Sequence, residues 1–395
     1  MTNTPVQPTE VALFTECYRP IVNGVVASID ALRAGLAECG VAVTIVAPHF
    51  PHERTGDDAI VRLPSLPLPM STGYRLCVPY LRRSARARIE RASVVHVHSP
   101  FVTGWLGANI ARRSGIPLVF TYHTRIDEYA HYAPFEPRLT RAAMTVLTRT
   151  FANRADTVIV PTAAMHARLR EIGVRVPIAV VPSSIDVACF AAGRRSEAAR
   201  ALLGANGAAR VVLAVSRLAK EKHLELAIDA IACLRDVRLA IVGDGPHRAT
   251  LEARATARGV RDRVHFTGAL EPAALPDVYA GADAFVFPSP TETQGLVLAE
   301  ALATGLPVVA VDVPVNREVL GGFGRLVPPG PEALAQALAA AVAEPRDAAG
   351  ADFARRQYGR DRQAEAVLNV YRSVSLCRTF GTLVRDYASG SESFR

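Results

Sequence analysis

The chain has 395 residues, more than one hydrophobic core usually organises, so two or three domains are expected. Half of the residues are hydrophobic, which excludes a disordered chain, and the apolar runs stop well before the ~20 residues of a membrane-spanning helix. The formal net charge of +8 leaves nucleic acid, an anionic membrane surface and an anionic substrate to be weighed as partners.

The first residues of the chain and the spacing of its cysteines indicate in which cellular compartment the protein is expected. The first ten residues, MTNTPVQPTE, carry neither the basic nor the apolar segment of a secretory signal. The six cysteines are scattered without a CxxC pair, as expected for reduced thiols. We therefore expect a cytoplasmic protein.

A first series of short apolar strands alternates with helical segments. The strands are expected at 11–14, 41–47, 94–98, 118–123, 157–162 and 178–186, with a helix at 24–36. This alternation predicts an N-terminal Rossmann-like domain over residues 1–186. The stretch 187–206 is rich in Ala, Gly and Arg and lacks a strand pattern, so we expect it to link two domains.

A second series predicts another Rossmann-like domain over residues 207–358. Its strands are expected at 211–216, 238–245, 264–268, 284–289 and 307–311, and its helices at 224–234, 247–258, 275–281, 296–304 and 331–343. A C-terminal helix at 359–375 is expected to pack back on the first domain, followed by a loose tail at 376–395. The predicted fold class is α/β, with two doubly wound parallel-sheet domains that face each other across a cleft.

Polar residues follow two strands of the first series. Asn23 and Gly24 open the helix after the first strand, where backbone N–H groups bind phosphates or sugars, although an ordinary turn explains them equally well. His123 ends the strand at 118–123, and Tyr129 follows it. A histidine at a strand end can contact a reacting ligand or be purely structural.

Two further histidines lie on the strand at 94–98. His96 and His98 alternate and are therefore expected to point to the same face of the sheet. No third ligand at a suitable spacing supports a metal site, so we interpret both as structural.

The first strand of the second series is followed by SRLAKEK. Of the 45 basic residues in the chain only two are lysines, Lys220 and Lys222. An ammonium acts as a compact point charge at a phosphate, which a planar guanidinium does not reproduce. We therefore predict that Arg217 and Lys222 bind a diphosphate and stabilise its leaving charge; a solvated helix start is the alternative.

The stretch 285–311 reads as strand, loop, helix and strand. Glu292 lies in the loop and Glu300 on the helix, while Gly295 marks the helix N-terminus. A loop at the carboxyl end of a parallel strand is where ligands of such sheets bind. Two carboxylates that flank a helix N-terminus suit a ligand with hydroxyls at both ends and an anion between them, such as a nucleotide sugar.

Two basic stretches, 75–91 and 138–154, are amphipathic. We expect each stretch to form a helix, and such helices can lie on an anionic bilayer surface or can be arginine-coated solvent faces. We predict that four residues contact the acceptor or a membrane surface: Arg82, Arg83, Arg86 and Tyr129.

Together these motifs resemble the family 4 retaining glycosyltransferases, which have the two-Rossmann GT-B fold. The most specific part is the pair Glu292 and Glu300 within PSPTETQGLVLAEALATGLPVV, supported by SRLAKEK, IVGDGP, VHFTGAL and the YHT segment. The resemblance covers about residues 11–373. The chain departs from the family pattern at two positions, where Asn23 and Ser184 each stand in place of a glycine.

The resemblance implies roles for individual residues. Glu292 contacts the donor sugar, Glu300 the ribose hydroxyls, and Arg217 with Lys222 the pyrophosphate, while His123 lies beside the reacting sugar. The remaining donor contacts that it implies are Asn23, Gly24, Ser216, Gly243, Gly268, Leu270, Thr293, Gln294, Gly295 and Leu296. No metal and no cofactor are implied, because the nucleotide sugar is itself the substrate.

Within this family the motifs resemble the lipid-acceptor branch. We predict a hexosyltransferase that uses UDP-glucose and forms an α-glycosidic bond to a membrane lipid such as 1,2-diacylglycerol, at the inner face of the cell membrane. A GDP-mannose-dependent mannosyltransferase is the alternative, and a nucleotide-sugar epimerase is a distant one. A nicotinamide dehydrogenase lacks support because no GxGxxG follows either first strand, and a nucleic-acid partner leaves Glu292 and Glu300 without a role. The sequence gives no basis for an oligomeric state.

Overall fold

The computed structural model describes residues 8–51, 56–68, 75–128, 136–205 and 209–390. It divides into two compact units, one formed by Met1–Ser183 with Arg360–Arg395 and the other by Ser184–Gly359. The expected linker at 187–206 is not a free connection, because it forms helices α6 (Val187–Ala191) and α7 (Glu197–Leu202) of the second unit. The side chains before these helices, Asp186 and Ser196, cap them.

The first unit is built on a seven-stranded parallel sheet in the order β3-β2-β1-β6-β7-β8-β9. These strands are β1 (Glu10–Phe14), β2 (Ala42–Pro48), β3 (Ile60–Leu63), β6 (Val94–Val97), β7 (Leu118–Thr121), β8 (Thr157–Val160) and β9 (Ile178–Val180). A separate antiparallel pair consists of β4 (Ser65–Pro67) and β5 (Arg75–Cys77). The sequence did not predict β3, β4 and β5, because they are short and partly exposed and lack a continuous apolar run.

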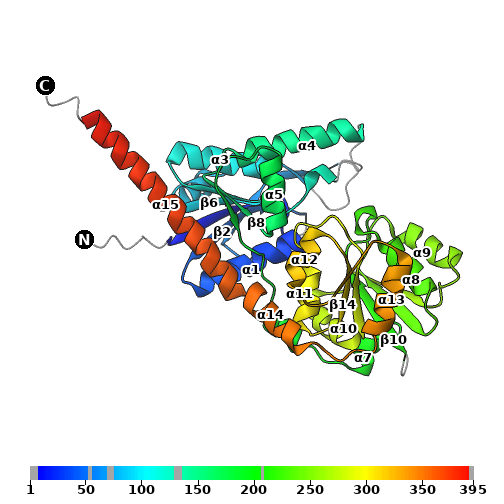
Figure 1. The fold of residues 1–395 in the computed structure, drawn as a ribbon. Helices are drawn as coiled ribbons and strands as arrows, with labels where there is room; N and C mark the ends of the chain where they lie inside the picture. Colours follow the sequence, from blue (N-terminus) through cyan, green and yellow to red (C-terminus); the bar gives the residue numbers. More distant parts are fainter. Residues whose placement is uncertain (1–7, 52–55, 69–74, 129–135, 206–208, 391–395) are drawn as a thin grey trace. The chain divides into compact units, whose positions relative to one another are not determined.

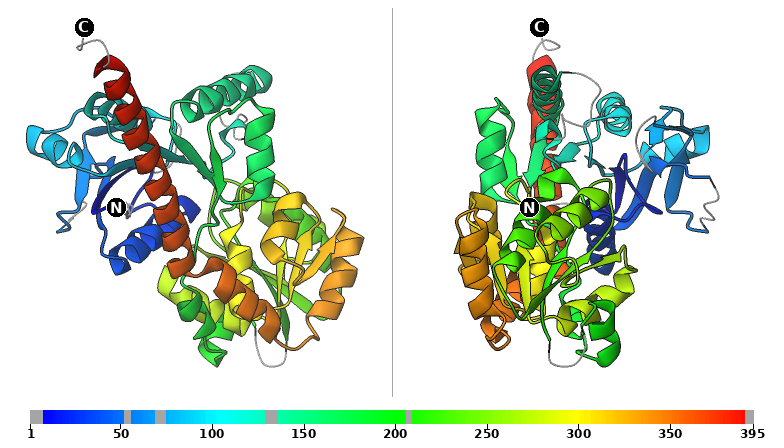
Figure 2. Two further views of the ribbon diagram at one scale, coloured as in Figure 1. Left: turned by 60° about the vertical axis from the view of Figure 1, so that its left-hand side comes forward. Right: turned by 90° about the vertical axis from the view of Figure 1, so that its right-hand side faces the viewer.

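Helices cover both faces of this sheet: α1 (Gly24–Glu38), α2 (Arg83–Ile89), α3 (Val102–Ser114), α4 (Pro137–Ala152), α5 (Ala163–Glu171) and α15 (Arg360–Gly390). On one face, Leu13 and Ile45 pack against α1 and against Tyr371 of α15. On the other face, Phe120 meets Phe151 of α4 edge to face. Figures 1 and 2 show α15, in red, running beside the blue α1, with which it is in contact.

The C-terminal segment differs from the expectation in one respect. A single helix, α15, runs from Arg360 to Gly390, so 376–390 is helical rather than a loose tail. The expected helix at 359–375 forms its first half, which groups with the first unit. Val367, Leu368 and Tyr371 bury their side chains in the core of that unit.

The second unit contains a six-stranded parallel sheet in the order β12-β11-β10-β13-β14-β15. Its strands are β10 (Arg210–Val215), β11 (Val237–Val242), β12 (Val264–Gly268), β13 (Ala284–Phe287), β14 (Val308–Val311) and β15 (Arg325–Val327). Counted within the unit this is the order 3-2-1-4-5-6 of Rossmann folds. The prediction of two Rossmann-like α/β units is therefore confirmed.

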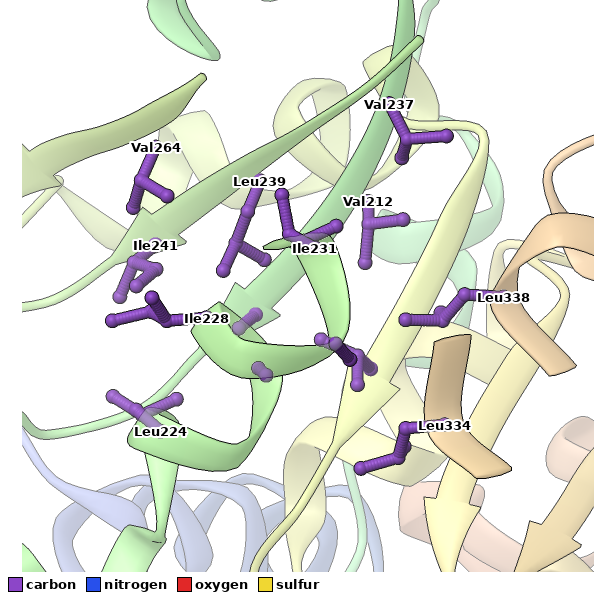
Figure 3. Packing of buried hydrophobic residues seen from close by; sticks show 14 of the residues in the cluster. Val212, Leu224, Ile228, Ile231, Val237, Leu239, Ile241, Val264, Leu334 and Leu338 are labelled. Atoms are coloured by element: carbon purple, nitrogen blue, oxygen red, sulfur yellow. The ribbon is translucent and has the colours of Figure 1, made fainter. Parts of the chain in front are cut away.

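The helices of this unit are α8 (Leu224–Ala232), α9 (Arg248–Ala257), α10 (Leu275–Gly281), α11 (Leu296–Ala303), α12 (Pro314–Leu320), α13 (Pro331–Ala341) and α14 (Ala348–Tyr358), with the 3₁₀ helices η2 (Lys220–Lys222) and η3 (Pro272–Ala274). Figure 3 shows Ile228 of α8 and Leu338 of α13 packing with Val212 and Leu239 of the sheet. Alternate residues of the strands face the opposite side. There Phe285 stacks on Tyr279 of α10.

Candidate active site

The sheet of the second unit reverses its strand order between β10 and β13, which lie side by side. Ligands of such sheets bind at this point, outside the carboxyl ends of the strands. The loop after β10 carries Lys222, and the loop after β13 carries Glu292. The Lys222 Nζ lies 2.5 Å from Glu292 Oε1, although the two residues are 70 apart in sequence. The fold thus brings together two residues that were singled out from different motifs.

Polar side chains, two of them buried and one partly buried, hold the loop of Glu292 in place. The Ser289 hydroxyl donates to Glu292 Oε1 at 2.9 Å, and Thr291 Oγ1 donates to the carbonyl of Glu221 at 3.3 Å. The fully buried Asn316 of α12 donates from Nδ2 to the Ser289 carbonyl at 3.4 Å and to the last carbonyl of β14 at 2.9 Å. Neither Ser289 nor Asn316 was predicted from the sequence. The position of Ser289 just after a strand was a usable signal, whereas Asn316 carried none.

The cations predicted to bind a diphosphate are paired with carboxylates. Arg217 forms an ion pair with Glu221, four residues further on. Burial acts to raise the pKa of Glu292, but the charge and hydrogen bond of Lys222, the Ser289 hydroxyl and the charge of Arg217 together lower it below its ordinary value. Glu292 is therefore ionised at neutral pH, and an anion that enters this site competes with two carboxylates for two cations.

Glu300 of α11 has a different electrostatic environment. The buried Tyr279 hydroxyl donates to Glu300 Oε2 at 2.7 Å. Burial raises the pKa of Glu300 to about 7, although the Tyr279 hydrogen bond acts to lower it. Tyr279 was not predicted from the sequence, because an aromatic residue inside α10 carries no sequence signal for this contact.

Glycines bring the loops after β10, β11 and β12 together. Gly243 N–H donates to the Gly268 carbonyl at 2.9 Å. Gly243 has φ 129°, and a Cβ there would lie 2.0 Å from the Ser216 carbonyl oxygen, so a side chain does not fit. Leu270 lies two residues beyond β12 and is partly buried. The close packing of these loops explains why glycine stands at position 243. Contacts of Ser216, Gly243, Gly268 and Leu270 with a donor stay a prediction.

The segment between Glu292 and α11 contains the other predicted donor contacts. Thr293 is partly buried, and Gln294 is buried with 3% of its surface exposed. Gly295 has φ 75°, in the left-handed region that glycine favours, and precedes Leu296, the first residue of α11. The predicted helix N-terminus therefore lies at the expected place.

In the first unit, Asn23 caps α1. Its Oδ1 accepts a hydrogen bond from Val26 N–H at 3.0 Å, and its Nδ2 donates to Cys17 Sγ at 3.0 Å. Gly24 is the first residue of the helix and is exposed. These contacts account for Asn23 as a helix cap, the alternative that the sequence left open, and contact with a donor stays a prediction.

Glu16 lies near the carboxyl ends of β1 and β6, which are neighbours in the first sheet. Its Oε2 accepts a hydrogen bond from Thr103 N–H at 2.9 Å and another from the Thr103 hydroxyl at 2.5 Å, at the N-terminus of α3. Burial raises the pKa of Glu16 above its ordinary value although these bonds act to lower it. Glu16 was not predicted from the sequence, although its position just after a strand was an available signal.

Three histidines form a column at the carboxyl edge of this sheet. His96 and His98 point to the same face, as predicted, with ring centroids 4.3 Å apart. His96 is buried and bonded on both nitrogens, to the hydroxyls of Tyr371 at 2.7 Å and Thr121 at 2.6 Å. His98 Nδ1 lies 2.7 Å from His123 Nε2, and the two rings stack. Burial lowers the pKa of His123 to about 4.

The basic stretch 75–91 is not one amphipathic helix. It begins with β5, and α2 begins only at Arg83. The helix buries Ile89 in the core. The arginines predicted to contact a membrane are exposed: Arg82, Arg83 and Arg86. The fourth residue of that group, Tyr129, lies outside the described residues.

Exposed apolar side chains lie on the strand pair β4 and β5, which precedes these arginines in sequence, and on α4. Leu66 of β4 and Leu76 of β5 pair across their strands and are 60% and 47% exposed. On α4, Leu139 is 72% exposed and Val146 49%, whereas Phe151 is buried. Of the helices in the described part of the chain, none is both long and apolar enough to cross a bilayer.

Comparison with protein families gives two matches. Residues 22–188 match the family described as Glycosyltransferase Family 4, and residues 196–359 match the family described as Glycosyl transferases group 1.

Two relatives cover most of the chain. An alpha-monoglucosyldiacylglycerol synthase of Streptococcus pneumoniae is 31% identical over 328 residues, 80% of this chain and 74% of the relative. A GDP-mannose-dependent alpha-mannosyltransferase of Mycobacterium tuberculosis is 34% identical over 328 residues, 81% of this chain and 84% of the relative.

Solved structures share the fold. HepE of Anabaena in complex with UDP and glucose has a TM-score of 0.71 at 19% identity, covering 92% of this chain and all of the other. Sucrose-phosphate synthase of Thermosynechococcus elongatus has a TM-score of 0.68 at 22% identity, covering 97% of this chain and all of the other.

Proposed function

This chain belongs to glycosyltransferase family 4 and is a glycosyltransferase, and we propose that it moves a glucosyl group from UDP-glucose to a membrane lipid such as 1,2-diacylglycerol, with retention of configuration. The observation that carries the donor half of this proposal is the contact between Lys222 and Glu292 at the switch point of the second sheet. A cation for the diphosphate and a carboxylate for the sugar hydroxyls lie side by side there, which supports a sugar diphosphate as the ligand.

Binding of the donor exchanges one set of ion pairs for another. The diphosphate oxygens take the cations Lys222 and Arg217 from Glu292 and Glu221, so the charge that develops on the leaving diphosphate is stabilised by groups already in place. Glu292, released from Lys222, accepts hydrogen bonds from hydroxyls of the donor sugar. Glu300 accepts hydrogen bonds from the ribose hydroxyls.

Retention requires that the acceptor attacks from the side on which the diphosphate leaves. The bond from the anomeric carbon to the diphosphate oxygen breaks, and the bond from that carbon to the acceptor oxygen forms on the same face. A departing phosphate oxygen takes the proton of the acceptor hydroxyl. His123 contacts the transferred sugar. The step as proposed needs neither a metal nor a cofactor, and unchanged turnover in excess EDTA is the expected result.

A lipid acceptor and a peripheral place at the inner face of the membrane fit the surface of the first unit. The exposed pair Leu66 and Leu76, followed in sequence by Arg82 and Arg83, combines apolar side chains with positive charge. This combination favours the interface of an anionic bilayer. The S. pneumoniae relative, a synthase of monoglucosyldiacylglycerol by its name, supports the same acceptor class.

The second candidate is a mannosyltransferase that uses GDP-mannose. It is favoured by the M. tuberculosis relative, whose 34% identity exceeds that of the glucosyl relative. The proposed chemistry at Lys222, Arg217 and Glu292 is the same for either donor.

One assay separates these candidates. Purified protein is incubated with anionic liposomes that contain diacylglycerol and with labelled UDP-glucose, UDP-galactose or GDP-mannose, and label is then counted in the organic extract. Organic label from UDP-glucose alone is the expected result. Label in the organic phase from GDP-mannose alone would show that GDP-mannose and not UDP-glucose is the donor. Label that stays aqueous with all three donors contradicts diacylglycerol as the acceptor. Free sugar released without acceptor indicates an epimerase or a hydrolase.

A further inference from the structure

Within the column of three histidines, the surroundings of the His98 ring determine which nitrogen of His123 carries the proton. His98 is 4% exposed and lies directly after β6. Its Nδ1 contacts His123 Nε2 at 2.7 Å. Its other nitrogen, Nε2, is buried and has no hydrogen-bond partner among the described residues.

Both rings of this pair are neutral at physiological pH. Burial lowers the pKa of His123, and burial together with the adjacent imidazoles of His96 and His123 lowers that of His98. In a neutral imidazole one nitrogen is a donor and the other an acceptor. A single proton therefore occupies the contact between His98 Nδ1 and His123 Nε2.

The buried Nε2 of His98 decides on which side that proton lies. A buried N–H without an acceptor is rare in proteins, whereas a buried acceptor with an unused lone pair is tolerated more often. His98 therefore carries its proton on Nδ1 and leaves a lone pair on Nε2. It follows that His98 donates, that His123 Nε2 accepts, and that the proton of His123 is on its Nδ1.

We propose that His98 is a positioning residue that holds His123 as the neutral Nδ1–H tautomer, so that His123 offers an N–H donor to an oxygen of the transferred sugar. The consequence for the reaction rests on the proposed function, which places His123 beside that sugar. In this state His123 orients the sugar by a hydrogen bond and transfers no proton. The second nitrogen of a histidine commonly fixes the tautomer of the first in this way.

The tautomer is measured directly by long-range ¹H–¹⁵N NMR of the imidazole nitrogens, with the His123 signals identified by their loss in His123→Gln. In the wild-type protein we expect His123 to show a protonated Nδ1 and an unprotonated Nε2. A proton on His123 Nε2 overturns the proposal. The measurement needs no substrate, so it decides the tautomer even if transfer to diacylglycerol fails and the proposed function with it.

Two substitutions of His98 separate positioning from packing. His98→Asn keeps an amide N–H near the place of Nδ1, whereas His98→Leu removes the donor. We expect His98→Leu to lose the fixed tautomer and to lower kcat about 10- to 100-fold with a smaller change in donor KM, while His98→Asn keeps most of the wild-type kcat.

The matched control is Tyr371→Phe, which removes a hydrogen bond to His96 from the same column. We expect a lower melting temperature from this variant, with the His123 tautomer and kcat unchanged. If His98→Asn and His98→Leu lose activity equally, in proportion to their melting temperatures, His98 is only structural and the proposal fails.

Discussion

Lys222 and Glu292 form an ion pair at the point where the strand order of the second sheet reverses, with Nζ 2.5 Å from Oε1. Both side chains are largely buried, with exposed fractions of 17% and 15%. A partly buried pair loses much of its hydration, and each partner depends on the other. We propose that this pair binds the diphosphate of the donor.

Glu292→Gln tests the role of the carboxylate, because it keeps the shape of the side chain and removes its charge. We expect kcat to fall about 100- to 1000-fold, as for the loss of one preorganised group at a reacting centre. Affinity for the nucleoside diphosphate is expected to rise or stay equal, because Lys222 no longer has to leave a carboxylate. Steady-state kinetics and calorimetry measure the two quantities. The control is Glu344→Gln, in an exposed ion pair with Arg325, and equal kcat losses in both variants contradict the assignment.

Asn316→Leu tests the support of the Glu292 loop. The substitution removes the two hydrogen bonds that Asn316 Nδ2 donates, to the carbonyl of Ser289 in the loop after β13 and to the carbonyl of Val311 at the end of β14. The Val311 carbonyl still accepts from Val313 N–H, so the main loss is the donor to the Ser289 carbonyl. A buried polar group that loses its partner costs about 1–3 kcal/mol, and we expect the free energy of unfolding to fall by about that amount in urea denaturation. The kcat is expected to fall with it. A variant as stable and active as wild type shows that the loop is held by other contacts.

The pKa of Glu300, about 7, predicts a pH-dependent donor affinity. The carboxylate accepts hydrogen bonds better than the acid, so the donor KM should fall as the pH rises through about 7. Glu300→Gln should remove this dependence. Tyr279→Phe removes the bond that acts to lower the pKa, so the profile should move to higher pH. Tyr358→Phe, which removes another buried tyrosine bond in the same unit, is the control and should leave the profile in place.

The raised pKa of Glu300 also makes the free energy of unfolding depend on pH. Its folded-state pKa lies above the ordinary 4.5, so between these values the folded state binds a proton that the unfolded chain has released. Glu300 therefore contributes stability that is fully present below pH 4.5 and is lost as the pH rises through about 7. Because the side chain is partly exposed, we expect a contribution on the order of 1 kcal/mol. Chemical denaturation of wild type and Glu300→Gln at pH 5 and 8 measures it, and a difference that grows toward pH 8 in favour of wild type contradicts the sign.

The membrane contact is tested by charge reversal at two places. Arg82→Glu/Arg83→Glu and Arg112→Glu/Arg113→Glu change the net charge equally, and all four arginines are exposed. We expect only the first pair to weaken sedimentation with anionic liposomes, by about tenfold or more, since a basic residue near the surface contributes about 1 kcal/mol. Equal effects of both pairs show that the net charge and not this surface is responsible.

The fold was largely predictable, because parallel strands buried on both faces are continuous apolar runs. Val211 to Val215 and Ala284 to Phe287 are such runs. The edge strands β3 and β15 were missed because they contain Arg62 and Arg325 and are only partly buried. The long α15 was underestimated because its mixed composition beyond residue 375 looks like that of a loose tail.

The candidate site was predictable only where a residue stood out by type or place. Lys222 was found because lysine is rare in this chain, and Glu292 because it follows a strand. Tyr279 and Asn316 reach the site from α10 and α12, and such tertiary contacts leave no mark at one position of one sequence. The expected continuous helix at 75–91 was wrong because residues 75–77 pair with β4 as a strand, and this tertiary pairing is not visible in the arginine pattern.

The most direct test of the diphosphate site compares UDP with uridine, and GDP with guanosine, by calorimetry. The ratio of the affinities within each pair isolates the contribution of the diphosphate. Lys222→Ala should lower this ratio about 10- to 100-fold for the preferred base, as expected for loss of a charged hydrogen bond. Lys220→Ala, the other lysine two residues earlier and exposed, should leave it unchanged. An unchanged ratio in Lys222→Ala, or an equal loss in Lys220→Ala, contradicts the account.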